Sequence, residues 1–194
     1  MLNREEMARL HAGLPKNVLL VIDSAYAEYV TAKDYEAGIE LVTNNDNVVM
    51  TRTFSKLYGM AGLRAGAAFG RPDLLSKITP YGAGALPVTG MIGAAASLKV
   101  SKTLVPERRE LIGKTRTDVQ SWLTSKNVGF VPSTSNKIMI DTKRPGQEVI
   151  EGMFKEKVLI GRVWPVWPTY VRVSIGTPEE MAKFKTAFSK VMGV

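Results

Sequence analysis

The chain has 194 residues, of which 45% are hydrophobic, so it can bury the core of one large domain or of two small ones. It contains no cysteine and a single histidine, His11, which excludes disulfides, thiolate catalysis and cysteine-based metal sites and disfavours a zinc enzyme or a Ser-His-Asp hydrolase. The formal charge of +8 comes from basic residues scattered among acidic ones, so we expect no nucleic-acid partner, and the basic excess is compatible with a phosphorylated small ligand.

The sequence also predicts a cytoplasmic location and no membrane partner. No apolar stretch approaches the roughly 20 residues that cross a bilayer. Residues 1–11 mix basic and acidic side chains instead of building an apolar signal core.

The first half of the chain predicts an α/β arrangement. Asn3 followed by Glu6 indicates a capping box and a short helix that ends before Pro15. Val18 to Ile22 is continuously apolar, which predicts a strand covered on both faces, as in a parallel sheet. Further elements are expected, in chain order, as a helix within 33–41, strands at 48–54 and 63–69, and helices at 72–78 and 87–100.

The second half predicts a mixed α+β unit. From about Val105 to Trp122 a periodic segment indicates a long helix that leads into this unit. Its remaining elements are expected as strands at 129–131, 137–141, 159–163 and 170–175, a helix at 146–156, and a last helix after residue 177. The sequence therefore predicts two domains, 1–104 and 105–194.

One lysine stands out in the run from Thr53 to Gly66. Lys56 follows an apolar strand and lies among hydroxylic, small and glycine residues, an environment that suits a reactive amine facing an aldehyde cofactor. Ser55 and Thr53 offer hydroxyls and Arg64 offers a guanidinium, which are groups that bind phosphate. A glycine-rich stretch after a lysine is also typical of an ordinary turn.

A second apolar run, Val18 to Ile22, is followed by an acid and a phenol. We expect Asp23 to be buried at a strand end, where it would need a cationic partner, and a pyridinium nitrogen is such a partner, although a strand-end Asp more often caps a helix. Tyr26 could donate a hydrogen bond to the 3-oxygen of the same ring. Ligands of open α/β sheets bind beyond the carboxyl ends of strands, so these residues and Lys56 should converge. Together they indicate pyridoxal phosphate.

These motifs resemble those of the pyridoxal-phosphate aminotransferases of fold type I, and the chain is most similar to the histidinol-phosphate aminotransferases. The resemblance is carried by Tyr26-Ala27-Glu28-Tyr29, by Asp34-Tyr35-Glu36-Ala37-Gly38 and by the stretch from Asn47 to Gly66. It implies an α/β fold: part of a large, pyridoxal-phosphate-binding domain with a mostly parallel sheet and helices, followed by a small α+β C-terminal domain. It also implies a homodimer that serves histidine biosynthesis.

The resemblance assigns a role to each residue of the predicted site. The lysine of the Ser-Lys pair bonds covalently to the cofactor aldehyde, which places that catalytic role on Lys56. The acid and the phenol contact the pyridine nitrogen and the 3-oxygen, which places those roles on Asp23 and Tyr26. The cofactor phosphate is held by two hydroxyls and an arginine, here Thr53, Ser55 and Arg64.

Two further arginines are implied on the substrate side. Arg172, in the run from Tyr170 to Thr177, matches the arginine that clamps the substrate carboxylate or another polar end of the substrate. Arg162, after Leu159-Ile160-Gly161, matches a second arginine near the substrate phosphate. An arginine on a strand is also often a solvated or salt-bridged edge residue.

The resemblance begins in the middle of the family's sequence. The family's phosphate-gripping loop, the aromatic that stacks on the pyridine ring and an asparagine contact are expected before Met1. The implied activity is amino-group transfer between histidinol phosphate, or a related amino acid, and 2-oxoglutarate. Two alternatives are an inactive, truncated or remodelled chain that self-associates and a pyridoxal-phosphate-dependent decarboxylase of a phosphorylated amino acid.

Overall fold

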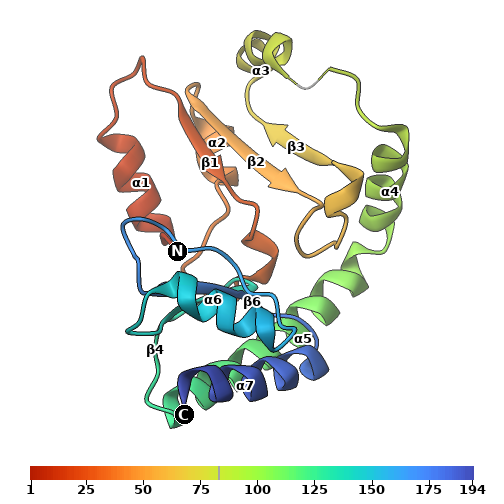
Figure 1. Cartoon of the computed structure of the whole chain (residues 1–194). Coiled ribbons are helices and arrows are strands. Elements are labelled where there is room, and N and C mark those ends of the chain that lie inside the picture. The colour runs from red at the N-terminus through yellow and green to blue at the C-terminus, as the bar shows by residue number, and fades with distance from the viewer. Residues whose placement is uncertain (83) are drawn as a thin grey trace. The chain divides into compact units, whose positions relative to one another are not determined.

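The computed structural model describes residues 1–82 and 84–194, and these form two compact units, Met1–Arg108 and Arg109–Val194 (Figure 1). The division between the units and the predicted division between residues 104 and 105 both lie within one helix, α5 (Ser101–Ser125).

Unit 1 is built on a three-stranded sheet in the order β1-β2-β3. Its strands are β1 (Leu20–Asp23), β2 (Val48–Thr53) and β3 (Gly66–Phe69), seen side by side in Figure 1. β1 pairs with β2 in parallel and β3 pairs with β2 antiparallel. The carboxyl ends of β1 and β2 therefore meet at one edge of the sheet.

The helices of unit 1 follow the predicted order, with one shift. The capping box of Asn3 and Glu6 is present, and α1 runs over Arg4–Ala12. The helix predicted within 33–41 begins later, as α2, because Gly38 with φ of +106° occupies its N-cap. The remaining helices are α2 (Ile39–Asn44), α3 (Pro72–Ile78), α4 (Val88–Lys99) and the short 3₁₀ turns η1 (Ala27–Tyr29), η2 (Ala61–Leu63) and η3 (Thr79–Tyr81).

The expectation that the first strand is covered on both faces is wrong for the described part of the chain. Ile22 is 9% exposed but Val21, which points to the opposite face, is 55% exposed. β3 is exposed along its whole length, whereas Val48, Val49 and Met50 of the central strand are buried. The core of unit 1 therefore lies mainly around β2, and β1 and β3 form edges of the sheet.

Unit 2 is an antiparallel three-stranded sheet packed against helices. Its order is β4-β5-β6, with β4 (Gly129–Val131), β5 (Lys137–Asp141) and β6 (Tyr170–Ser174). Helices α6 (Gly146–Lys155) and α7 (Pro178–Met192) follow β5 and β6, and the C-terminal part of α5 belongs to the same unit.

The core of unit 2 follows from alternation along the strands. Ile138 and Ile140 are fully buried and lie opposite Val173 and Val171 in the antiparallel register. The helices add buried side chains, which are Val119, Leu123, Val149, Met153, Met181, Phe184, Ala187 and Phe188. Such full burial contributes about 1.5–3 kcal/mol for each large apolar side chain.

The strand predicted at 159–163 is not formed. The segment makes one backbone hydrogen bond to β6, from Gly161 N–H to the Arg172 carbonyl at 2.8 Å. A tight turn follows directly, closed by a hydrogen bond from Trp167 N–H to the Trp164 carbonyl at 2.9 Å. This turn diverts the backbone before a ladder can continue along β6.

Within 1–82 and 84–194, no helix combines the length and apolar character that crossing a bilayer requires.

Candidate functional site

Lys56 lies in a short closed loop between β2 and β3. Phe54 and Ala65 form a backbone hydrogen bond of 3.1 Å across the base of the loop, and Gly59 N–H donates to the Lys56 carbonyl at 2.9 Å. Gly59 has a φ of +72°, which glycine adopts without strain. Leu57 is 3% exposed and anchors the loop, so the half-buried Lys56 side chain is held on a fixed backbone.

The phenol predicted beside Lys56 is in place. The Lys56 Nζ lies 5.5 Å from the centroid of the Tyr26 ring, within the range of a cation–π contact. Tyr26 directly precedes η1 in the connection that leaves β1. Residues about 30 positions apart in the sequence are thus brought together by the parallel pairing of β1 and β2.

Asp23 occupies the carboxyl end of β1, as predicted, but it is exposed rather than buried. Its Oδ1 accepts hydrogen bonds from Ala25 N–H at 3.2 Å and from the Thr51 hydroxyl at 3.5 Å. The reason is that β1 is an edge strand with one uncovered face. The carboxylate is oriented by these bonds and is open to a ligand.

The predicted phosphate residues lie between the last residue of β2, which is Thr53, and the start of β3. The Thr53 hydroxyl accepts a hydrogen bond from Ser55 N–H at 3.0 Å, which tightens the start of the lysine loop. Arg64 has a φ of +53° and donates from its guanidinium to the Ala61 carbonyl at 2.8 Å. Thr53 faces Gly66 in the β2–β3 register, which puts Arg64 and the two hydroxyls at the same end of the hairpin.

The charges of this group fit a pyridoxal-phosphate-like ligand. Asp23, Lys56 and Arg64 each lack an oppositely charged side-chain partner in the part of the chain that the structure describes. An acid, an amine and a guanidinium left uncompensated at one end of a sheet match a pyridinium nitrogen, an aldehyde and a phosphate. These residues, with Tyr26, are the ones that would hold such a cofactor.

A largely buried ion pair between Glu28 and Arg52 lies next to this group in the sequence and links η1 to β2. Glu28, whose side chain is 9% exposed, binds Arg52 of β2 at 2.5 Å. The neighbouring Tyr29 is 4% exposed, and its burial together with the Glu28 carboxylate raises its pKa to about 12. Burial also raises the pKa of Tyr58 in the lysine loop. These groups fix the segment that carries Tyr26, whose ring lies 6.4 Å from that of Tyr29.

The two arginines predicted for the substrate side both belong to unit 2, where both approach the same aromatic ring. The guanidinium of Arg162 lies 5.3 Å from the centroid of the Trp164 ring, and that of Arg172 lies 5.5 Å from it. Arg172 lies on β6, whereas Arg162 lies in the irregular segment before the turn. The sequence did not single out Trp164; the available signal was an aromatic two residues after Arg162, at the start of a Trp-Pro turn.

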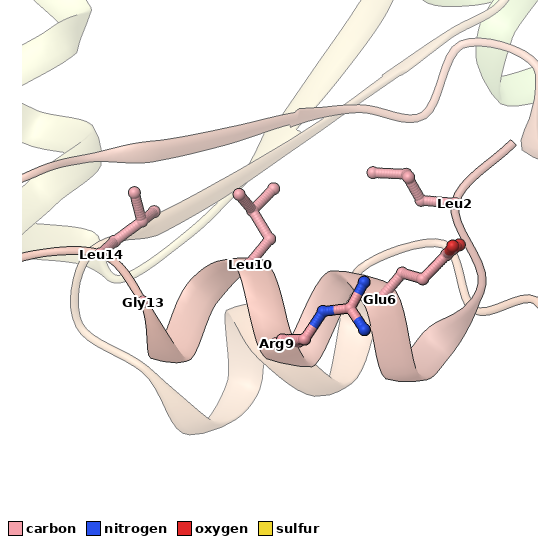
Figure 2. A pocket seen from close by; sticks show the side chains of 6 residues that line it. All are labelled: Leu2, Glu6, Arg9, Leu10, Gly13 and Leu14. Atoms are coloured by element: carbon pink, nitrogen blue, oxygen red, sulfur yellow. The ribbon is translucent and has the colours of Figure 1, made fainter.

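A groove of about 420 Å³ runs along α1, away from these residues in the sequence. Figure 2 shows Leu10 and Leu14 pointing to the same side of the helix, with Glu6 and Arg9 beside them. None of its lining residues belongs to the predicted site, and we assign it no role in the chemistry.

The fold and the lysine loop can now be compared with those of known protein families. The sequence matches the family "Aminotransferase class I and II" over residues 1–188. The chain belongs to this family.

Within this family, the chain is similar to histidinol-phosphate aminotransferases. The chain is 37% identical over 191 residues to a histidinol-phosphate aminotransferase of Rhodospirillum centenum, an alignment that covers 94% of this chain and 52% of the relative. A crystal structure from Erwinia carotovora atroseptica, assigned to the histidinol-phosphate aminotransferases, superposes with a TM-score of 0.92 at 26% identity and covers 98% of this chain and 55% of that one.

A further structure is that of the Sinorhizobium meliloti histidinol-phosphate aminotransferase in complex with pyridoxal-5'-phosphate. It superposes with a TM-score of 0.87 at 24% identity, over 99% of this chain and 53% of that one, and shows the same fold. The chain thus spans about half the length of the relatives that it matches.

Proposed function

We propose that this chain supplies the lysine and the cofactor-ring contacts of a pyridoxal-phosphate-dependent aminotransferase that uses histidinol phosphate as amino donor. The observation that carries the proposal is the Lys56 amine 5.5 Å from the Tyr26 ring centroid, at the sheet end where Asp23 and Arg64 lack charged partners. The likeness to histidinol-phosphate aminotransferases supports the choice of amino donor.

Each residue then has a defined task. Pyridoxal phosphate, when bound, supplies the electron sink that amino-group transfer needs. Lys56 would hold the cofactor at its aldehyde carbon, and its free amine would take the proton from the substrate α-carbon as a general base. Asp23 would pair with the protonated pyridine nitrogen, and Tyr26 would donate a hydrogen bond to the 3-oxygen. Thr53, Ser55 and Arg64 hold the phosphate group.

We further propose 2-oxoglutarate as the amino acceptor and a homodimer as the active assembly, with Arg162 and Arg172 as the substrate-side cations. Exposed apolar side chains of unit 1 support self-association. On α4 these are Val88 at 70%, Met91 at 55%, Ile92 at 65% and Leu98 at 55% exposure.

The test begins with covalent labelling of Lys56. The 194-residue protein is mixed with pyridoxal phosphate, reduced with borohydride, digested and analysed by mass spectrometry. We expect the label on the peptide that contains Lys56, and we expect Lys56→Ala to lose at least about nine-tenths of it, because the other lysines lack this group of partners. Lys77→Ala, on the exposed end of α3, is the matched control and should label like the unchanged chain.

Two results would contradict the proposal: a label spread evenly over the lysines, or full labelling of Lys56→Ala. In a separate assay, unreduced chain mixed with pyridoxal phosphate is supplied with histidinol phosphate and 2-oxoglutarate. Glutamate formation supports the aminotransferase. A parallel sample receives a phosphorylated amino acid instead, and carbon dioxide release there supports the decarboxylase. The absence of both products supports the alternative of an inactive chain.

A further inference from the structure

We propose that Trp164 is a positioning residue that holds Arg162 and Arg172 together as one binding site for a phosphate group of the substrate. This inference rests on the proposed function, because it concerns how the substrate-side cations of that enzyme are arranged. It assigns the selection of a phosphorylated substrate to an aromatic ring that itself bears no charge.

The backbone places the three side chains together from two directions. Gly161 N–H donates to the Arg172 carbonyl, and a Cβ at position 161 would lie 2.9 Å from that oxygen, so only glycine permits this approach. Arg162 is thereby held beside β6. The turn closed by Trp167 N–H and the Trp164 carbonyl then returns the indole toward both arginines, and Pro165 suits the second position of such a turn.

The ring compensates for a charge arrangement that is otherwise unfavourable. Two guanidinium groups beside the same ring repel each other, and neither has a carboxylate partner among residues 1–82 and 84–194. The negative face of the indole attracts both cations and restricts two long, flexible side chains. A site prepared in this way favours an anion, and a doubly charged phosphate more than a single carboxylate.

An independent observation is that Arg172 has an unused hydrogen-bond donor. Its Nε is buried and has no hydrogen-bond acceptor in the described part of the chain. A buried donor without an acceptor is destabilising, and a phosphate oxygen is an acceptor suited to a guanidinium. Trp164 and Arg172 are both half-buried, so the pair can be reached by a small anion.

The experiment is a titration of the whole chain with inorganic phosphate, followed by two-dimensional ¹H–¹⁵N NMR. The chain has three tryptophans, Trp122, Trp164 and Trp167, and each contributes one indole N–H signal, with that of Trp164 assigned from its loss in Trp164→Phe. We expect the Trp164 signal to shift and saturate. The Trp122 signal should stay in place, since that ring packs on Phe184 and Phe188 in the core.

Variants separate positioning from general packing. In the variants of Trp164, which lack its indole signal, binding is followed on the backbone N–H of Gly161 in the same spectra. Trp164→Leu keeps an apolar side chain but removes the π face, and we expect phosphate to bind about five- to tenfold more weakly. Trp164→Phe keeps a π face and should stay within about threefold of the unchanged chain. Trp167→Leu is the matched control in the same turn, because Trp167 contacts the Tyr170 ring, and its phosphate affinity should not change.

The inference is overturned if Trp164→Leu binds phosphate as tightly as the unchanged chain, or if all three indole signals shift alike. If Trp164→Leu does not fold, the titration of the unchanged chain and of Trp164→Phe still decides the matter. The titration needs no cofactor, so a chain that labels at Lys56 but fails here retains the proposed function and loses only this inference. With turnover available, Trp164→Leu should raise the KM for histidinol phosphate with little change in kcat.

Discussion

At the scale of single residues, the sequence predicted which side chains lie close together better than it predicted their burial. Lys56 and Tyr26 were predicted to meet, and the structure places them in contact range. Asp23 was predicted at a strand end and buried, but it is exposed. Residue type determines the chemistry of a side chain. Its burial depends on which strands and helices cover it, and the local sequence does not determine that packing. Trp164 escaped detection for the same reason, because its partners come from separate segments.

Tyr29 should make the protein less stable as the pH rises above 10. Its pKa is raised from 10.0 to about 12, first by burial and then by Glu28. The folded chain therefore keeps this proton above pH 10 while the unfolded chain releases it. The free energy of unfolding should fall by about 1.4 kcal/mol per pH unit between pH 10 and pH 12 on this account.

The check is urea unfolding across that pH range. In Tyr29→Phe, the free energy of unfolding should fall less between pH 10 and pH 12, because the titrating phenol is gone. Below pH 10 the variant should be less stable than the unchanged chain by the amount that the phenol contributes. Tyr81→Phe is the control, because Tyr81 is 90% exposed and should leave the pH profile unaltered. Parallel profiles for the unchanged chain and Tyr29→Phe would rule out this source.

At the scale of secondary-structure elements, local signals located the helices well and the strands less evenly. The structure confirms the capping box predicted at Asn3 and the helix predicted after residue 177, and it shows a capping box at Thr177 as well. The strand predicted at 159–163 is absent, because a strand exists only through its neighbours and this segment makes one backbone bond to β6 before its turn. The signals of a helix, its caps and its periodicity, lie within the segment itself, so helices are predicted from the sequence more reliably than strands.

The capping box of α7 should contribute measurably to the stability of unit 2. The Thr177 hydroxyl accepts from Glu180 N–H at 3.2 Å, and the Glu180 carboxylate accepts from Thr177 N–H at 2.8 Å. Thr177→Ala should lower the free energy of unfolding by about 1 kcal/mol, because the Glu180 N–H loses its hydroxyl acceptor. Faster amide hydrogen exchange in α7 and a lower urea midpoint would show it.

A threonine inside the same helix provides the comparison. Thr186 is exposed and its hydroxyl only bonds back to the Ala182 carbonyl at 3.2 Å. Thr186→Ala should leave stability unchanged or slightly higher, since alanine is the better helix former. Equal losses in both variants would show that the cap contributes nothing.

At the scale of the whole molecule, the two units differ in how completely they bury their apolar residues. Unit 2 encloses a continuous core between its sheet and its helices. Unit 1 buries mainly the central strand and leaves β3 and much of α4 exposed. The fold class and the α+β character of the second unit followed from element order, but this difference could not, because it depends on what lies against each face.

The exposed surface of unit 1 should drive self-association. In sedimentation velocity, the chain should form dimers or larger species as its concentration rises. Replacing both Met91 and Ile92 of α4 by lysine should raise the dissociation constant at least about tenfold, because charge would have to enter an apolar contact.

Leu159→Lys serves as the control for added charge, since Leu159 is 81% exposed but belongs to unit 2. It should associate like the unchanged chain. A chain that stays monomeric at all concentrations, or an equal effect of both sets of substitutions, would contradict association through α4.

The distribution of aromatic residues gives each unit its own optical reporter. All three tryptophans lie in Arg109–Val194, whereas five of the six tyrosines, at positions 26, 29, 35, 58 and 81, lie in Met1–Arg108. Indole fluorescence therefore follows the melting of the C-terminal unit alone, and tyrosine signals follow chiefly the N-terminal one. These intrinsic fluorophores can therefore show, without any added label, whether the unit that contains Lys56 and the unit that contains Arg162 and Arg172 unfold in one step or in two.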